Sequence, residues 1–259
     1  MTLVAIYFLF PFIYMFFSAF KTEAEAVAYP PNFFPENWNW GNFIDAWKAQ
    51  PFGKFFLNSL TVTVLSAVGS MASAAVVAYG FARYNFKGKK ILFMILLSTM
   101  MIPWDVTMIP QYMEFKWFGW INTLKPLIVP SWFGSAYYIF LMRQFLAGIP
   151  RDYEEAARID GVNDFQIFYK IFVPIMKPSL ILVGVLNMIA AWNDYLGPLI
   201  FLQDRDKYTL ALGLAAFKGV HSEKIIPMLC ITIIMIIPPI IVFLFAQKYI
   251  VEGTSGSIK

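Results

Sequence analysis

Long apolar runs separated by short polar segments dominate the sequence. A membrane-spanning helix needs about 20 mostly apolar residues, and six segments meet this requirement: residues 1–20, 58–82, 91–113, 126–142, 179–202 and 225–247. Four of them contain no charged residue, whereas the third contains Asp105 and the fifth contains Asp194. Runs of this length favour helices over barrel strands. The pattern therefore predicts an all-α integral membrane protein, with six transmembrane helices in a single domain, residues 1–259.

The basic residues predict how these helices are oriented. Six crossings put both termini on one side, together with the loops 83–90 and 143–178 and the tail from residue 248. These segments carry eleven of the 20 Lys and Arg residues, and the opposite loops carry nine over a greater total length. Since the more basic side usually faces the cytoplasm, we expect an N-in/C-in topology. The first segment has no basic leader, which favours a retained first span over a cleaved signal peptide.

Composition excludes several classes of function. Hydrophobic residues make up 59% of the chain and charged residues 14%, whereas a soluble chain carries about 25% charged residues. The single cysteine and single histidine, Cys230 and His221, allow no internal disulfide and no His/Cys zinc site. No G-x-x-x-x-G-K-[ST] motif is present to bind ATP. The net charge of +4 is too small and scattered to indicate nucleic-acid binding. We therefore expect a non-catalytic membrane protein that binds no metal or cofactor itself.

The loop between the fourth and fifth predicted spans, residues 149–178, is long for so hydrophobic a chain. Pro150 and Asp152 are typical of a helix start, and Glu155 completes the spacing of a capping box. Gly161 is placed to end this helix, because glycine readily adopts the left-handed conformation of a C-cap. The sequence therefore predicts a short helix with a glycine corner after it.

A second short helix should follow the corner, capped by Asn163 or Asp164 and ended by Pro174 and Pro178. An apolar stripe runs along it, formed by Phe165, Phe168 and Phe172. Two interpretations remain open from these residues alone. The bent segment could dock into a groove of another protein, or Glu155 could simply cap a helix while the phenylalanines pack under the bundle.

The segment Glu155-Ala-Ala-Arg-Ile-Asp-Gly161, followed by Phe165, Phe168 and Pro174, resembles the EAA loop of permease subunits from binding-protein-dependent ABC importers. Further stretches are similar to the carbohydrate, MalG-like branch of these permeases: residues 51–59, 191–199, 207–213 and 247–253. The likeness covers nearly the whole chain. Val162 departs from the usual alanine, and the ending 254–259 matches the family's tail only loosely.

This resemblance implies a type I ABC importer permease fold in the bacterial plasma (inner) membrane. It implies a pair of permeases, usually two different ones, above two cytoplasmic ATPases that bind ATP and Mg²⁺. An extracytoplasmic binding protein would deliver the sugar. By the same likeness, the coupling helix that sits in a cleft of the ATPase is formed by Glu155, Ala156, Ala157, Asp160 and Gly161, with Phe165 beside it.

Polar residues within the spans are candidates for a substrate pathway. Asp105 follows a Pro-Trp pair, and Asp194 lies with Asn187, Trp192 and Asn193 on the fifth span. Charged groups in a membrane usually face a cavity, a partner or an interface, and aromatic faces with amides and carboxylates suit a sugar. Solvation at the span ends, or packing and gating, would also explain them. A second class of function, an ion-coupled secondary transporter, would use Asp105 or Asp194 as the coupling carboxylate.

Overall fold

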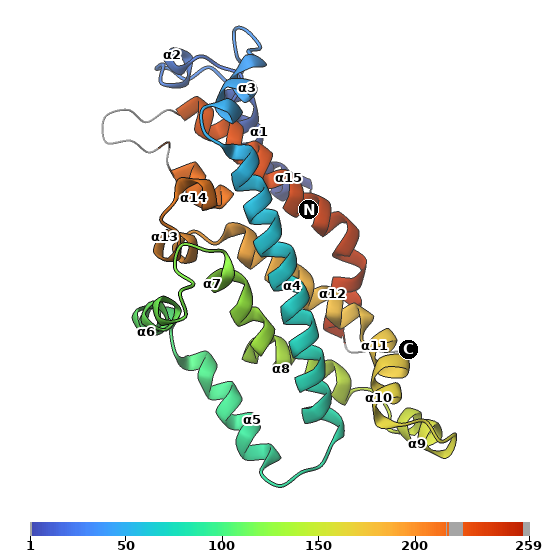
Figure 1. Cartoon of the computed structure of the whole chain (residues 1–259). Helices are drawn as coiled ribbons and strands as arrows, with labels where there is room; N and C mark the ends of the chain where they lie inside the picture. The colour runs from blue at the N-terminus through green and yellow to red at the C-terminus, as the bar shows by residue number, and fades with distance from the viewer. Residues whose placement is uncertain (1, 216, 218–224, 256–259) are drawn as a thin grey trace.

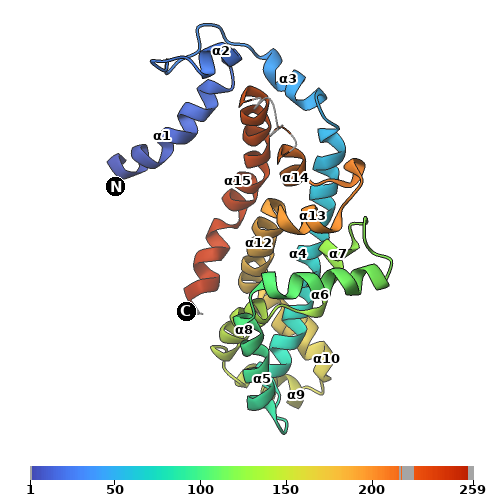
Figure 2. The ribbon, with the colours of Figure 1, turned by 90° about the vertical axis from the view of Figure 1, so that its left-hand side faces the viewer.

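The structure is a computed structural model that describes residues 2–215, 217 and 225–255, and over these residues its regular structure is entirely helical (Figures 1 and 2). The all-α prediction is confirmed for this part of the chain. The elements are α1 (Thr2–Ser18), α2 (Glu23–Ala26), α3 (Gly41–Lys48), α4 (Phe52–Arg83), α5 (Lys89–Ser98), η1 (Thr99–Met101), α6 (Trp104–Trp117), α7 (Lys125–Ile128), η2 (Val129–Phe133), α8 (Ala136–Ala147), α9 (Asp152–Ile159), α10 (Asp164–Gln166), η3 (Ile167–Phe172), α11 (Val173–Ile175), α12 (Lys177–Asn193), α13 (Leu196–Phe201), η4 (Arg205–Lys207), α14 (Leu210–Ala215) and α15 (Ile225–Ser255).

Two helices, α4 and α15, are each long and apolar enough to cross a membrane. With 32 residues, α4 extends for about 48 Å at 1.5 Å per residue. The predicted spans 58–82 and 225–247 lie within these two helices. Two sharply bent helix pairs raise the number of candidate spans in the described residues to at most four. Six crossings and the N-in/C-in orientation therefore stay predictions.

The third predicted span is not one straight helix. It consists of α5 with η1 and of α6, whose axes differ in direction by 98°. The break lies at Ile102, which has an extended backbone (φ −83°, ψ 111°), just before Pro103. Proline disfavours the helical conformation of the residue before it and donates no backbone hydrogen bond. As a result, α6 turns across the bundle instead of continuing α5 (Figure 2).

The fourth and fifth predicted spans are also interrupted. The segment 126–142 contains α7, η2 and most of α8, with Gly134 (φ +93°) between η2 and α8. The segment 179–202 contains α12 and α13, separated at Asp194, whose backbone is extended (φ −66°, ψ 121°). Apolar composition therefore locates these segments but does not show where each helix breaks.

The helices α4, α8 and α12 pack closely because α4 presents small side chains to its neighbours. Gly69 of α4 likewise lets η2 approach, since a Cβ atom there would lie 2.5 Å from the indole of Trp132. Such small residues let helix backbones approach one another. The hydrophobic core at one end of these helices also includes Ala157 and Phe172 from residues 149–178. That shared core fixes the position of the candidate site.

Candidate functional site

Residues 149–178 form a bent helical segment, which we call the elbow (Figure 1). Its first helix, α9, begins at Asp152, and the residue before it, Arg151, makes no side-chain capping hydrogen bond. The capping box predicted for Asp152 and Glu155 is therefore wrong. Because the helix starts one residue earlier than that motif requires, Asp152 lies inside the first turn with Glu154 and Glu155. Three carboxylates there are stabilised by the positive end of the helix dipole.

The corner after α9 forms as the sequence predicts. Gly161 has a left-handed backbone (φ +76°) and donates a hydrogen bond to the Arg158 carbonyl at 3.1 Å. The Val162 amide then reaches back to the Ala157 carbonyl at 3.0 Å, which completes a Schellman-type helix end. Asn163 caps the next helix through a reciprocal pair of hydrogen bonds with Gln166. The capping role predicted for Asn163 is confirmed.

The second helix of the elbow runs from Asp164 to Ile175 and contains one π-helical stretch, η3. It bends by 72° into α12, and Pro178 lies in the first turn of α12 instead of ending the helix before it. Phe168 and Phe172 pack against Tyr79 of α4, with ring centroids 5.0 and 5.1 Å apart. Phe165 is not part of this contact, because its side chain is 76% exposed. The predicted aromatic stripe therefore divides into the buried ring of Phe172, the partly buried ring of Phe168 and the exposed ring of Phe165.

Most of the residues expected to contact an ATPase lie on the surface of the elbow. Glu155, Ala156, Asp160, Gly161 and Phe165 are exposed, whereas Ala157 is buried in the core. Ile159 is 86% exposed, and Tyr153 and Tyr169 are exposed as well. We call Tyr153, Ile159, Phe165 and Tyr169 the elbow patch. Sequence analysis did not select Tyr153, Ile159 or Tyr169, although large apolar residues among charged ones are a signal of an interaction surface.

A buried arginine that sequence analysis did not identify connects the elbow to the bundle. Arg83, at the end of α4, lies 3.1 Å from the Glu154 carboxylate, and the two side chains are 5% and 12% exposed. Its guanidinium also donates hydrogen bonds to the carbonyls of Leu146 (2.8 Å) and Ile149 (3.0 Å), and it stacks over the Phe172 ring. The elbow is therefore fixed to the ends of both α4 and α8.

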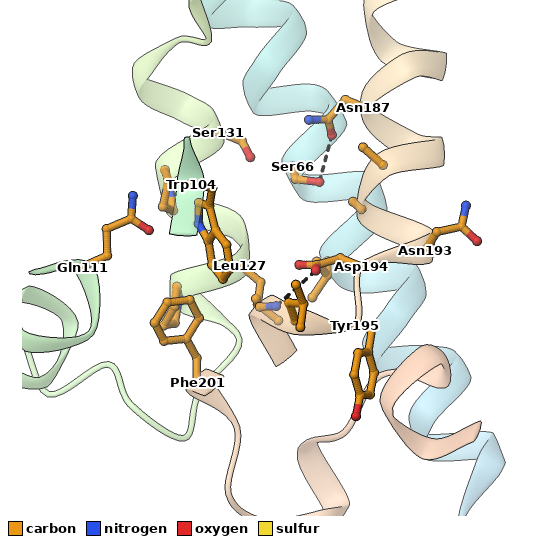
Figure 3. Close-up of a pocket in the computed structure, with 17 residues that line it drawn as sticks. Ser66, Trp104, Gln111, Leu127, Ser131, Asn187, Asn193, Asp194, Tyr195 and Phe201 are labelled. Carbon is orange, nitrogen blue, oxygen red and sulfur yellow. Dashed lines mark hydrogen bonds between the residues drawn. The ribbon is translucent and has the colours of Figure 1, made fainter. Parts of the chain in front are cut away.

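A cavity of about 680 Å³ lies among α4, α6, α7, η2, α12 and α13 (Figure 3). Its polar lining includes Ser66, Gln111, Ser131, Asn187, Asn193 and Asp194, and its aromatic lining is Trp104, Tyr195 and Phe201. The breaks before α6 and before α13 bring these residues together, because α6 and α13 run across the bundle instead of continuing the helices that precede them (Figure 2). The interrupted spans thus build the cavity.

The structure divides the five residues proposed for a substrate pathway. Asn187, Asn193 and Asp194 line the cavity, whereas Asp105 and Trp192 do not. The Trp192 side chain is 3% exposed and donates a hydrogen bond from Nε1 to the Met235 carbonyl of α15 at 3.0 Å. Asp105 lies in the first turn of α6 and is exposed, next to Trp104, which does line the cavity.

Asn187 and Asp194 are held in place by short polar contacts. Asn187 of α12 donates to Ser70 Oγ at 2.9 Å and accepts from Ser66 Oγ at 3.0 Å, which joins α12 to α4. Asp194 accepts a hydrogen bond from the Gly197 amide at 3.1 Å and so supports the first turn of α13 (Figure 3). Both residues therefore have a structural role in addition to facing the cavity.

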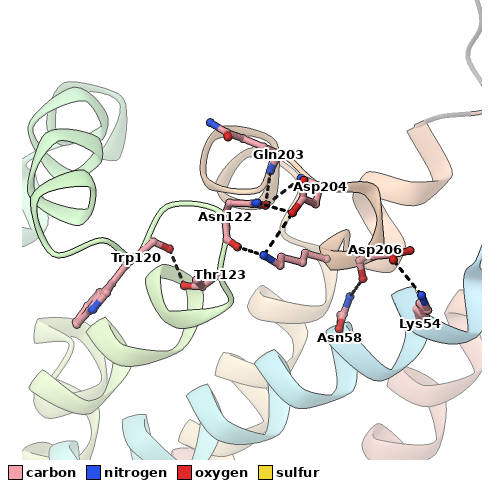
Figure 4. A network of polar contacts seen from close by, with 9 residues as sticks. Lys54, Asn58, Trp120, Asn122, Thr123, Gln203, Asp204 and Asp206 are labelled. Atoms are coloured by element: carbon pink, nitrogen blue, oxygen red, sulfur yellow. Dashed lines mark hydrogen bonds and ion pairs between the residues drawn. The ribbon is translucent and has the colours of Figure 1, made fainter.

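Asn122, in the loop between α6 and α7, clamps that loop to the segment that follows α13 (Figure 4). Its side chain accepts hydrogen bonds from the Gln203 and Asp204 amides and donates one to the Asp204 carboxylate at 2.6 Å. Its carbonyl accepts a hydrogen bond from Lys207 Nζ. The hydrogen bond from the Asn122 side-chain amide lowers the pKa of Asp204, and the nearby Lys207 ammonium lowers it further. The bonds to the Asp204 carboxylate therefore stabilise the fold at a pH above the ordinary pKa of aspartate. This stabilisation is lost as the pH falls through the lowered pKa of Asp204.

The clamp predicts different effects for two small substitutions at Asn122, whose backbone is left-handed (φ 62°). Asn122→Ala removes the side-chain bonds and also strains the backbone, because an alanine pays about 1–2 kcal/mol in this conformation. Asn122→Gly removes the same bonds without that strain. We expect the alanine variant to unfold at a lower temperature than the glycine variant, and both below the parent, in thermal denaturation of the purified chain. Equal midpoints for all three would show that the clamp contributes nothing.

Comparison with known proteins identifies the chain. The family described as "Binding-protein-dependent transport system inner membrane component" matches residues 70–255. The chain belongs to this family. It is 33% identical to the "Probable ABC transporter permease protein YurM" of Bacillus subtilis, over 96% of this chain and 83% of that protein. It is 34% identical to the "Arabinooligosaccharides transport system permease protein AraQ" of the same organism, over 80% and 73% of the two chains.

A solved structure shows the same architecture. A chain of a bacterial ABC transporter involved in the import of the acidic polysaccharide alginate superimposes with a TM-score of 0.85. The two chains are 26% identical, and the match covers 96% of this chain and 93% of the other. The protein is thus an ABC importer permease of the inner membrane, a class that works with ATPase and substrate-binding partners. Nothing in these comparisons favours the ion-coupled alternative.

Proposed function

We propose that this chain forms half of the translocation pathway of an ABC importer for a sugar or oligosaccharide. The observation that carries the proposal is the likeness, over 80–100% of this chain, to permeases named for the transport of such solutes. The relatives' names mention arabinooligosaccharides, melibiose, raffinose, stachyose and lactose. The likeness includes both the elbow and the cavity, since it extends over most of the chain.

The chemistry of the cavity supports a polyhydroxylated solute. Its amides and hydroxyls can donate to and accept from sugar hydroxyls, and the flat faces of Trp104 and Tyr195 can pack on sugar C–H surfaces. Among the described residues that line the cavity, Asp194 is the one with an acidic or basic side chain. A few convergent polar groups in a largely apolar pocket are typical of a small-molecule site. A second, different permease would complete the pathway on the open side of this cavity.

We propose that the elbow transmits the work of ATP hydrolysis to the bundle. The elbow patch, together with Glu155, Ala156, Asp160 and Gly161, would dock on a partner ATPase, which binds ATP and Mg²⁺. Ala157 would support this surface from the core. Because Arg83 fixes the elbow to α4 and α8, movement of the ATPases would move these helices as a rigid unit. A ligand that binds one state better can drive such a change between inward- and outward-facing states.

Uptake by the reconstituted complex tests this function. The chain would be placed in vesicles with its partner permease, its ATPases and its binding protein, and accumulation of a labelled oligosaccharide would be measured. We expect accumulation to require ATP and to persist when a protonophore and a sodium ionophore remove the ion gradients. Accumulation that needs a gradient and no ATP would overturn the proposal in favour of ion coupling through Asp105 or Asp194.

Variants of Asn187 and Trp192 distinguish a residue that contacts the sugar from one that only packs between helices. Losing one hydrogen bond costs about 1 kcal/mol, or roughly fivefold in affinity, so Asn187→Ala should raise the half-saturating sugar concentration about fivefold. Trp192→Phe removes the bond to Met235 and part of a buried ring, so it should lower thermal stability while leaving that concentration unchanged. Transport titrations and melting curves of both variants check this. The reverse pattern would place Trp192, and not Asn187, on the pathway.

A further inference from the structure

A second groove, of about 740 Å³, lies where α5 begins and α8 ends. Three of its lining residues are basic: Lys89, Lys90 and Arg143. This groove is separate from the elbow, although α5 begins at the same end of the molecule that carries α9 (Figure 1). The function proposed above makes no use of it.

The three cations have no acidic partner among the residues that the structure describes. Arg143 stacks over the Phe93 ring at 4.2 Å, and its Nε atom is buried with no hydrogen-bond acceptor in this part of the chain. The Lys89 ammonium donates to the Tyr84 carbonyl, at 2.8 Å. Burial lowers the pKa of Lys89, and the nearby charges of Arg143 and Arg151 lower it further. The groove therefore concentrates positive charge that an anion would relieve.

The remaining lining gives the groove an apolar wall that extends along α5. Ile91 and Met94 are exposed, and Phe93 is partly exposed beneath Arg143. Lys89 and Lys90 directly precede the predicted span 91–113, and Arg143 directly follows the span 126–142. The cations thus lie at the level expected for lipid head groups, while the apolar wall lies at the level of the acyl chains. Basic pockets between helices at a membrane surface bind anionic head groups.

We propose that this groove binds an anionic phospholipid, with its phosphate on Lys89, Lys90 and Arg143 and its acyl chains along α5. Free inorganic phosphate would satisfy the cations but would leave the apolar wall uncovered. An acidic surface of the ATPase would likewise gain nothing from exposed Ile91 and Met94. A lipid satisfies both parts of the groove at once. This inference does not depend on which solute is transported.

Native mass spectrometry of the purified full-length chain tests the proposal. The chain would be titrated in detergent with phosphatidylglycerol, with phosphatidylcholine of the same acyl chains, and with inorganic phosphate. We expect retention of phosphatidylglycerol over phosphatidylcholine. Each cation near a membrane contributes about 1 kcal/mol, or roughly fivefold, so Lys90→Gln should weaken retention about fivefold and Lys90→Gln/Arg143→Gln about 25-fold. Lys87→Gln removes an exposed cation of the same loop that does not line the groove, and it should change nothing.

Several results would overturn the proposal. Equal retention of the two lipids would remove the role of the anionic head group. Equal losses in Lys87→Gln and Lys90→Gln would show diffuse attraction without a site. Phosphate that competes fully with phosphatidylglycerol would assign the groove to the free ion. If Lys90→Gln left lipid retention unchanged and, in the assembled transporter, released the ATPase, the cations would face an acidic surface of that partner. Because Lys90 is exposed, its single variant keeps the test valid even if Arg143→Gln does not fold.

Discussion

Replacing Ile159 and Phe165 together by aspartate should release the chain from its ATPase while leaving the chain folded. Both side chains are largely exposed, so the substitution removes little packing within the chain. At a protein interface, the loss of an apolar anchor costs about 2 kcal/mol or more. Two such losses correspond to a roughly thousandfold weaker complex. Co-purification of the ATPase and ATP-driven uptake should therefore both disappear, and the thermal midpoint of the chain should stay within about 1 °C of the parent.

An equivalent pair at the opposite end of the molecule provides the control. Val27 and Tyr29 are also highly exposed, and they lie in the segment between α2 and α3. Val27→Asp/Tyr29→Asp adds the same charge at a comparable exposure, and the ATPase should still co-purify. The docking surface is assigned wrongly if the elbow variant keeps its ATPase, or if both variants lose it to the same extent.

Arg83→Met should destabilise the chain by about 3–5 kcal/mol, the usual cost of leaving one member of a buried ion pair without its partner. Methionine fills much of the same space, so the loss of stability does not come from a cavity. It arises because the buried Glu154 carboxylate loses its counter-charge and the carbonyls of Leu146 and Ile149 lose their hydrogen-bond donor. Glu154→Gln should cost less, because Arg83 keeps both carbonyl acceptors. Denaturant or thermal unfolding of the purified chain measures both effects.

The double variant Arg83→Met/Glu154→Leu separates the ion pair from general packing. An apolar pair of similar volume can replace a buried ion pair at little cost, so we expect the double variant to be more stable than Arg83→Met alone. Stability is then restored only in part, because the carbonyls of Leu146 and Ile149 still lack their donor. Uptake per ATP hydrolysed should be low because α8 is no longer tied to the elbow through Arg83. Additive losses in the double variant would show that Arg83 and Glu154 do not interact.

The long apolar runs made α4 and α15 predictable, because hydropathy reports on length and composition directly. The breaks in the other spans were harder to foresee. Pro103 marks one of them in the sequence, but whether a proline kinks a helix or redirects it by 98° depends on the helices it packs against. The interruption at Asp194 has no proline or glycine at the break itself. Its extended backbone goes with a local contact that hydropathy does not report, in which the Asp194 carboxylate accepts a hydrogen bond from the Gly197 amide at the start of α13.

The elbow shows the same division between local and distant signals. Gly161 and Asn163 were predictable, since a left-handed corner and a capping box depend on residues within a few positions. Arg83 was not, because its partner Glu154 lies 71 residues further along the chain. Trp192 and Asn193 are neighbours in sequence, yet Trp192 packs on α15 and Asn193 reaches the cavity. Sequence placed both on one helix without showing which face of α12 each occupies.

The central claim is that the bent corner of the elbow transmits force from a separate ATPase. Gly161→Pro tests it most directly, because proline fixes φ near −65° and cannot adopt the observed +76°. Gly119→Pro is a matched control outside the elbow, just after α6: Gly119 also has a positive φ (+67°), donates to the carbonyl three residues before it, and has open space at the Cβ position. In the reconstituted complex, we predict that Gly161→Pro abolishes ATP-driven uptake while ATP hydrolysis continues, and that Gly119→Pro retains uptake. Unchanged uptake with Gly161→Pro would contradict the account.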